Sequence, residues 1–188
     1  VASIKDAVVL IDVTLKTPAG ELGGSGSGFV TSPNGQVITN AHVVSMVTED
    51  AEGGTVVAED RSVQVVFHPG TAQEKAFDAR VLRENHDLDL ALLQIEPDTP
   101  VYLELADSEA VPETSLIYAC GHPLGLREIS IRTGTVTAHR TWQGKRYVEH
   151  DASAEEGNSG GPVILPDTRV VGVHTLTLVS SGMLTKFA

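Results

Sequence analysis

Three side chains that could together break an acyl bond lie far apart in this sequence. Ser159 stands in the block GNSGG (157–161), where small and turn-forming neighbours would expose its hydroxyl in a tight turn. His42 directly follows a strand-like run, and Asp89 opens an apolar run in which a buried carboxylate requires a hydrogen-bonded partner. A hydroxyl whose proton passes to an imidazole that a carboxylate orients is a nucleophilic catalyst. We therefore predict that Ser159, His42 and Asp89 meet in one site.

Each of these residues also has an ordinary structural explanation when it is taken alone. A Gly- and Ser-rich block is more often a simple turn, a histidine after a strand is often a core residue, and an aspartate before a strand often caps it. Jointly, the order His42, Asp89, Ser159 matches one known chain order of the catalytic triad. Asp87 is the alternative to Asp89, because residues two apart on a strand point to the same face.

The turn at Ser159 could also supply hydrogen-bond donors for a developing negative charge. The amides of Gly157 and Ser159 would point at a common position, which is the geometry of an oxyanion hole. Glycine suits position 157, because a backbone that turns its amide outward often adopts a conformation closed to residues with a Cβ. The sequence therefore predicts the oxyanion hole at Gly157 and Ser159.

The elements that must position these residues are predicted to be strands. Short runs rich in Val, Ile and Leu recur between turn residues, and no window longer than about a dozen residues holds a helical apolar period. Candidate strands cover residues 8–15, 27–31, 36–39, 62–67, 78–84, 90–95, 115–120, 129–138, 146–150, 162–165 and 170–177. Prolines and acidic residues after position 96 are typical of a connector. We predict an all-β chain with two small barrels, 1–98 and 113–188, joined by residues 99–112, with a cleft between them.

The composition excludes several classes of function. The 188 residues carry 25 acidic and 13 basic side chains, and the formal net charge of −12 would repel the phosphates of nucleic acids and anionic lipids. All apolar stretches are far shorter than the roughly 18 residues that cross a bilayer, so no membrane insertion is expected. Residues 1–6 lack the pattern of a secretory signal. The single cysteine, Cys120, excludes an internal disulfide and is expected to be a small buried apolar residue.

Two further features could be mistaken for ligand sites. The run GGSGSG (23–28) is rich in glycine like a phosphate-binding loop, but it lacks the lysine and no helical pattern follows it. We predict that it is a flexible or closely packed start of a strand. The histidines other than His42 show no metal-ligand spacing such as H-E-x-x-H. Neither a metal nor another cofactor is expected.

Five blocks follow one another along the chain: GSGFV (26–30), TNAHV (39–43), DLAL (89–92), GHPLG (121–125) and GNSGG (157–161). In type and order they resemble the HtrA/Deg branch of the chymotrypsin-like serine proteases, from about residue 4 to the end. The resemblance implies two six-stranded antiparallel β-barrels of the trypsin type with the active site between them. It implies Ser159 as nucleophile, His42 as general base and then acid, and Asp89 as the group that orients the imidazole. The DLAL block favours Asp89 over Asp87.

The resemblance also implies an activity. The chain is expected to be a serine endopeptidase that cleaves peptides or unfolded proteins through an acyl-enzyme, in the manner of protein quality-control proteases. The alternative is a non-proteolytic or conditionally inactive β-barrel module that binds unfolded polypeptides. An extracytoplasmic location, periplasmic or secreted, is typical of the branch. A PDZ domain and an oligomer are also typical of it, although this sequence encodes neither the domain nor an evident trimerisation arm.

The sequence defines the specificity pocket, which binds the substrate residue before the scissile bond, less well than the catalytic residues. Ser153, six residues before the nucleophile, replaces the acid of basic-specific proteases, so cleavage after Lys or Arg is not expected. The run VGVHTL (171–176) resembles the strand that pairs with substrate, so His174, Thr175 and Leu176 are expected to contact it. His174 stands where glutamyl endopeptidases recognise a carboxylate, but Ala154 lacks the hydroxyl of acid-specific relatives. A small aliphatic preference is therefore placed ahead of an acidic one.

Overall fold

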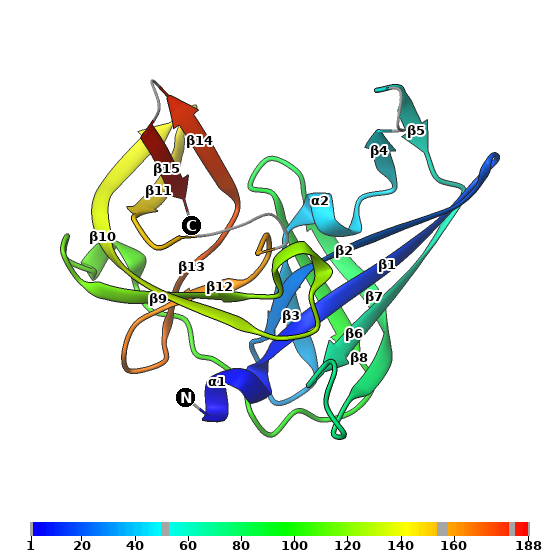
Figure 1. Ribbon diagram of the computed structural model, residues 1–188, viewed down its shortest axis with the longest axis horizontal. Coiled ribbons are helices and arrows are strands. Elements are labelled where there is room, and N and C mark those ends of the chain that lie inside the picture. The colour runs from blue at the N-terminus through cyan, green and yellow to red at the C-terminus, as the bar shows by residue number, and fades with distance from the viewer. Residues whose placement is uncertain (1, 50–52, 154–157, 181–182, 188) are drawn as a thin grey trace.

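Strands dominate the structure, a computed structural model that describes residues 2–49, 53–153, 158–180 and 183–187 (Figure 1). Two β units lie side by side, and the chain completes the first before it begins the second. The predicted all-β fold class is confirmed. None of the described helices is long and apolar enough to cross a lipid bilayer.

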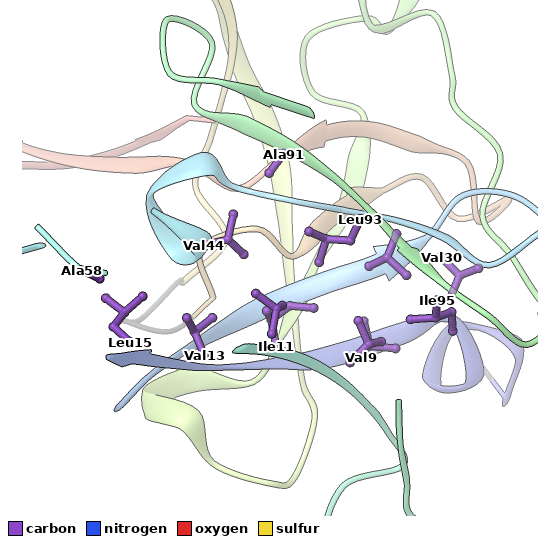
Figure 2. Packing of buried hydrophobic residues seen from close by; sticks show 13 residues of the cluster. Val9, Ile11, Val13, Leu15, Val30, Val44, Ala58, Ala91, Leu93 and Ile95 are labelled. Carbon is purple, nitrogen blue, oxygen red and sulfur yellow. The ribbon is translucent and has the colours of Figure 1, made fainter. Parts of the chain in front are cut away.

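The first unit, which we call the closed barrel, has six antiparallel strands in the order β1-β2-β3-β8-β7-β6. Its strands are β1 (Val8–Thr17), β2 (Gly20–Val30), β3 (Gln36–Thr39), β6 (Asp60–Phe67), β7 (Lys75–Asn85) and β8 (Leu90–Ile95). On β8 every second residue is buried, because alternate side chains of a strand point into the barrel. Valine, isoleucine and leucine side chains from several strands and from Val44 fill the interior (Figure 2).

The second unit, which we call the curled sheet, has seven strands in the order β13-β12-β9-β10-β11-β15-β14. They are β9 (Leu116–Gly121), β10 (Ser130–Trp142), β11 (Lys145–His150), β12 (Pro162–Ile164), β13 (Val170–Val173), β14 (Leu176–Ser180) and β15 (Met183–Phe187). The edge strands β13 and β14 are consecutive in the chain and are separated only by His174 and Thr175. The two edges of the sheet are therefore joined through this bend. Counting β13 and β14 as one interrupted strand gives the six strands that were predicted.

Several short elements escaped the sequence analysis. They are α1 (Ala2–Ala7), α2 (Ala41–Val44), the 3₁₀ turns η1 (Ser108–Ala110) and η2 (Pro123–Gly125), and the hairpin of β4 (Val47–Glu49) and β5 (Thr55–Val57) outside the barrel. Elements of three to six residues are too short to show a hydrophobic period. Strand β15 was not predicted either, and the strand predicted at 170–177 is divided at the bend.

The segment between β8 and β9 links the two units and contains one isolated parallel bridge, from Leu105 to Val170. The boundaries assigned to the connector, 99–112, stay a prediction.

The second half of the glycine run of β2 packs tightly against its neighbours, whereas Gly23 and Gly24 lie in open space. A Cβ at Gly28 would lie 2.9 Å from the carbonyl oxygen of Ile38, and one at Gly26 would lie 2.6 Å from a methyl carbon of Val43. Both distances are too short for ordinary contacts, so this part of the strand requires glycine. The prediction of a closely packed strand over this run is confirmed for these two positions.

Candidate active site

His42 and Asp89 meet at the end of the closed barrel, at α2, which lies near the centre of Figure 1. Asp89 Oδ2 lies 2.7 Å from His42 Nδ1, and Asp89 Oδ1 accepts a hydrogen bond of 2.9 Å from the backbone N–H of His42. One carboxylate therefore holds both the ring and the main chain of the same residue. The His42 side chain is 51% exposed, so the ring is reachable from solvent while its Nδ1 is occupied.

Asp87 does not join this pair. Residues 86–89 form a turn and not a strand, so the argument that Asp87 and Asp89 share one strand face is wrong. The Asp87 carboxylate lies 3.0 Å from Lys145 Nζ, and the Asp87 side chain is 82% exposed. Asp89 has a φ of 53°, in the left-handed region that few residues other than glycine adopt. This turn directs the Asp89 carboxylate, and not that of Asp87, toward His42.

Ser159 lies in a turn whose main chain is bonded to both units. Its carbonyl oxygen accepts a 2.9 Å hydrogen bond from Ser27 N on β2. The next residue, Gly160, donates to the carbonyl of His174, and the N–H of His174 donates to the carbonyl of Gly161, both at 2.9 Å. These bonds fix the backbone around the hydroxyl, since they reach β2 on one side and the 174–175 bend on the other.

Gly160 packs closely against β2 and β3 of the closed barrel. Its φ is +87°, and a Cβ there would overlap the carbonyl oxygen of Ser27 and the hydroxyl oxygen of Thr39. Thr39 Oγ1 in turn donates to the carbonyl of Ser27 at 2.7 Å. Only glycine combines this backbone conformation with such a close approach.

His42 and Ser159 line one cavity of about 270 Å³ between α2, β1, β2 and the β4 hairpin. Its other lining residues include Leu22, Ser25 and Thr48. A larger cavity, of about 760 Å³, is lined by residues such as Phe67, His68 and Pro97 and contains none of the predicted site residues. Size therefore does not identify the site. The candidate site is instead the cavity whose lining combines Ser159 with His42, the residue that Asp89 binds.

The residues predicted for substrate specificity are placed less uniformly. Ser153 is exposed, whereas His174 is buried with its ring edge-on to that of His150, the ring centres being 5.7 Å apart. Thr175 is partly buried and hydrogen-bonded within the protein. Leu176 begins β14 and pairs with Phe187. Ala154 and Gly157 lie outside the described residues. One of the two proposed oxyanion donors, the amide of Gly157, is therefore not described. The specificity and oxyanion roles stay predictions.

Two residues that support the site were not singled out from the sequence, although both lie in its motifs. Ser27, in the block GSGFV, bonds to the carbonyl of Ser159 and accepts a 2.8 Å hydrogen bond from the N–H of His122 through its hydroxyl. Asn40, in the block TNAHV, donates to the carbonyl of Asp89 at 2.7 Å. The available signal in both cases was a polar residue inside one of the blocks on which the resemblance rests.

Two titratable groups behind the site are shifted by burial. Desolvation lowers the pKa of the His122 imidazole from its ordinary value, so this ring resists protonation. Burial raises the pKa of the Cys120 thiol to about 12, which keeps it neutral and unreactive near pH 7. The prediction of a buried Cys120 is confirmed. In the part of the chain that the structure describes, no group of three His, Cys, Asp or Glu side chains could hold a metal ion.

The closed barrel, the curled sheet and the serine at their junction define a protein of the chymotrypsin-like class. A family model described as a trypsin-like peptidase domain matches residues 26–173, and the chain belongs to this family. The chain is 34% identical over 168 residues to serine protease HTRA4 of Mus musculus, covering 83% of this chain and 30% of that protein. It is 28% identical over 162 residues to a probable periplasmic serine endoprotease, DegP-like, of Chlamydia pneumoniae, covering 84% of this chain and 30% of the relative. The resemblance to the HtrA/Deg branch is therefore confirmed.

A solved structure supports the same fold. An HtrA-type protease, AlgW, in a variant form with a tripeptide, superposes with a TM-score of 0.77 at 21% identity, covering 99% of this chain and 57% of that one. At this identity the likeness shows the fold alone. The chain spans about 30% of the length of the curated relatives described above.

Proposed function

We propose that this chain is the protease domain of an HtrA-type serine endopeptidase that works through an acyl-enzyme. One observation carries the proposal: Asp89 holds His42 Nδ1 at 2.7 Å while His42 lines the same cavity as Ser159. The family membership and the serine protease relatives support the same activity.

In the proposed mechanism Asp89 fixes the imidazole so that Nδ1 carries the proton and Nε2 is the base. Nε2 takes the proton of the Ser159 hydroxyl as Oγ attacks the peptide carbonyl. The same nitrogen then returns this proton to the departing amine, and a water molecule activated by His42 hydrolyses the acyl-enzyme. The amides of Gly157 and Ser159 are proposed to bind the oxyanion, a contribution that in such sites is worth about 2.7 to 4 kcal/mol per donor.

The proposed substrates are peptides and unfolded proteins. A small aliphatic residue before the cut is proposed ahead of Glu or Asp, because His174 is only 4% exposed and a substrate carboxylate has little of its ring to contact. Ser153 carries no charge for a basic residue. An extracytoplasmic location is proposed on the ground that the chlamydial relative is named as periplasmic. A PDZ domain in the full protein and an oligomer stay predictions from the resemblance.

The test combines covalent labelling and cleavage mapping. A fluorophosphonate probe should label the folded chain once, at Ser159, and the Ser159→Ala variant should not react. Ser108→Ala, which removes a serine in η1 away from the cavity, is the matched control and should label like the wild type. Mass spectrometry of an unfolded protein after incubation should find cuts that are absent with Ser159→Ala.

The alternative function predicts a different result. If the wild type neither reacts with the probe nor cuts the unfolded protein, but binds that protein tightly, the chain is a binding module and the proposed activity is wrong. If cuts appear and lie after Glu or Asp, the activity stands and the aliphatic preference is wrong.

A further inference from the structure

Asn40 occupies the N-cap position of α2, but its side chain does not cap the helix. Asparagine at this position usually accepts a hydrogen bond from the N–H two or three residues later. Here Asn40 has the extended backbone of an N-cap, with φ of −78° and ψ of 150°, and no side-chain capping bond. The N–H of His42 is instead taken by Asp89 Oδ1 at 2.9 Å. Asp89 therefore caps the helix that carries His42, and the amide of Asn40 is available for other partners.

The amide nitrogen of Asn40 bridges the two units. Asn40 Nδ2 donates to the carbonyl oxygen of Asp89 at 2.7 Å and to Thr175 Oγ1 at 3.1 Å. Thr175 Oγ1 itself donates to the carbonyl of Val173 at 2.9 Å, so the hydroxyl is used both as donor and as acceptor. Only the nitrogen of the amide can face a carbonyl oxygen, and these partners thus determine the orientation of the Asn40 side chain. The bridge joins the end of β3, the turn at Asp89 and the 174–175 bend.

The hydrogen bond from Asn40 to Asp89 acts on a residue whose backbone conformation is unfavourable. With a φ of 53°, Asp89 occupies a conformation that persists when surrounding contacts hold it. His42 holds the carboxylate of Asp89, and Asn40 holds its carbonyl oxygen. The two bonds at opposite ends of the residue leave Asp89 little freedom to rotate its carboxylate away from the imidazole.

The hydrogen bond from Asn40 to Thr175 links the orientation of Asp89 to the position of the curled sheet. The preceding residue, His174, exchanges main-chain bonds with Gly160 and Gly161 beside Ser159. One two-residue bend therefore supports the turn of the nucleophile through its backbone and reaches Asp89 through Thr175 and Asn40.

We propose that Asn40 is a positioning residue for the reaction. It acts through Asp89 to set the orientation of His42, and through Thr175 it makes that orientation depend on the docking of the 174–175 bend. Its exposed fraction is 0%, so it touches no substrate and affects the chemistry only through its partners. This inference rests on the proposed function, since it assigns a further residue to the same site.

The experiment uses variants that differ in single hydrogen bonds. Asn40→Ala removes both bonds of the bridge, Thr175→Val removes the hydroxyl with little change in shape, and Thr175→Ser retains it. The matched control is Thr99→Val. Thr99 is a buried threonine whose hydroxyl accepts from Gly35 N and donates to Ser32 O in the turn between β2 and β3, and it does not line the cavity of His42 and Ser159. The readouts are the rate of fluorophosphonate labelling at Ser159, kcat and KM on a peptide, the proton NMR signal of His42 Nδ1–H, and the melting temperature.

Thr175→Val should label roughly three- to tenfold more slowly and Asn40→Ala roughly ten- to a hundredfold, the range expected for one and two hydrogen bonds. The loss should fall on kcat and leave KM nearly unchanged, and the Nδ1–H signal should broaden or shift. Thr175→Ser should recover most of the rate. The double variant should be no slower than Asn40→Ala, because Thr175 acts through the same amide. Thr99→Val should lower the melting temperature without changing rate or signal.

Wild-type rates and an unchanged Nδ1–H signal in both Asn40→Ala and Thr175→Val would overturn the positioning role while leaving the protease activity intact. If the wild type fails to label or cleave, the proposed function is wrong, and the NMR signal alone then decides the positioning role. Should Asn40→Ala fail to fold, the Thr175→Val and Thr175→Ser pair carries the test, since both residues fit the existing space. Equal labelling by those two variants would also overturn the proposal.

Discussion

On the side of the closed barrel, His42 and Asp89 are held by side-chain hydrogen bonds between residues of that barrel. The turn of Ser159 is instead held by main-chain bonds, one of which crosses to β2 of the closed barrel. Asp89 reaches His42 by both carboxylate oxygens. The carbonyl of Ser159 is bonded to Ser27, and its neighbour Gly160 to His174. The imidazole and carboxylate therefore bond directly to each other within one barrel and are linked to the other unit only indirectly, through Asn40 and Thr175, whereas the turn of Ser159 is bonded to the other unit directly.

This difference predicts two classes of substitution with different effects. A substitution at the His42 and Asp89 pair should change the chemistry and leave the fold stable. A substitution at the junction around Ser159 should change the chemistry and the stability together, because this turn contacts the closed barrel through the bond from Ser27 and the close approach of Gly160.

Gly160→Ala tests the junction. The added Cβ overlaps the carbonyl of Ser27, and the φ of +87° is unfavourable for alanine, so we expect a loss of about 3 kcal/mol or more of unfolding free energy and near-complete loss of labelling at Ser159. Gly144→Ala is the matched control: its φ is +76°, but nothing lies within 4 Å of the new Cβ. It should cost about 1 kcal/mol and leave the labelling rate unchanged. Equal effects in denaturant unfolding would show that backbone strain and not the junction explains the result.

Asp89→Asn tests the pair. The amide oxygen can still accept the N–H of His42 and preserve the cap of α2, but the side chain no longer carries a charge to orient and stabilise the imidazole. We expect kcat to fall about 10³- to 10⁴-fold, as for the same change in other triads, with little change in melting temperature. Asp87→Asn, at an 82% exposed side chain, should change kcat less than twofold. A comparable loss in both variants would contradict the assignment of Asp89.

Arg61→Leu tests the support behind α2. Arg61 Nη1 donates to the carbonyl of Val44 at 2.5 Å and Nη2 lies 2.5 Å from Glu84, with both side chains about one fifth exposed. Removing the guanidinium leaves the mostly buried carboxylate of Glu84 without this partner, and we expect a loss of about 2 to 3 kcal/mol of stability with a labelling rate roughly threefold lower. Arg169→Ala, at an exposed pair with Asp167, is the control and should change neither quantity measurably. A large loss of labelling without a loss of stability would contradict a purely supporting role.

His122→Gln tests how burial of the His122 ring, next to Ser27, affects the pH dependence of the unfolding free energy. Because burial lowers the pKa of His122, the folded state binds this proton less readily than the unfolded state, whose ordinary value is 6.5. Stability contributed by the neutral ring is thus present above pH 6.5 and is lost as the pH falls below it. The wild type should lose more unfolding free energy between pH 7.5 and 5.5 than His122→Gln, by at most about 1.4 kcal/mol per pH unit. Parallel pH curves for the two proteins, measured by denaturant titration, would contradict this prediction.

The catalytic candidates could be proposed from the sequence because their chemistry depends on residue type and local blocks, and the contact between His42 and Asp89 is observed. His42, Asp89 and Ser159 could each be proposed from their neighbours, and the strands over the valine- and isoleucine-rich runs are observed. The bridge from Asn40 to Thr175 could not be predicted. It joins residues 135 positions apart, and it exists only when the two units dock. The four-residue α2 and the division of the last long strand at His174 escaped for a related reason, because tertiary contacts and not local periodicity determine them.

The central claim is that Ser159, His42 and Asp89 act as one unit across the junction. The most direct test is a crystal structure of the protein after reaction with a fluorophosphonate. The account predicts phosphorus bonded to Ser159 Oγ, His42 Nε2 within about 3.2 Å of an oxygen of the adduct, and Asp89 still bonded to Nδ1. An adduct on another residue, or an adduct at Ser159 with the His42 ring turned away from it, would contradict the account.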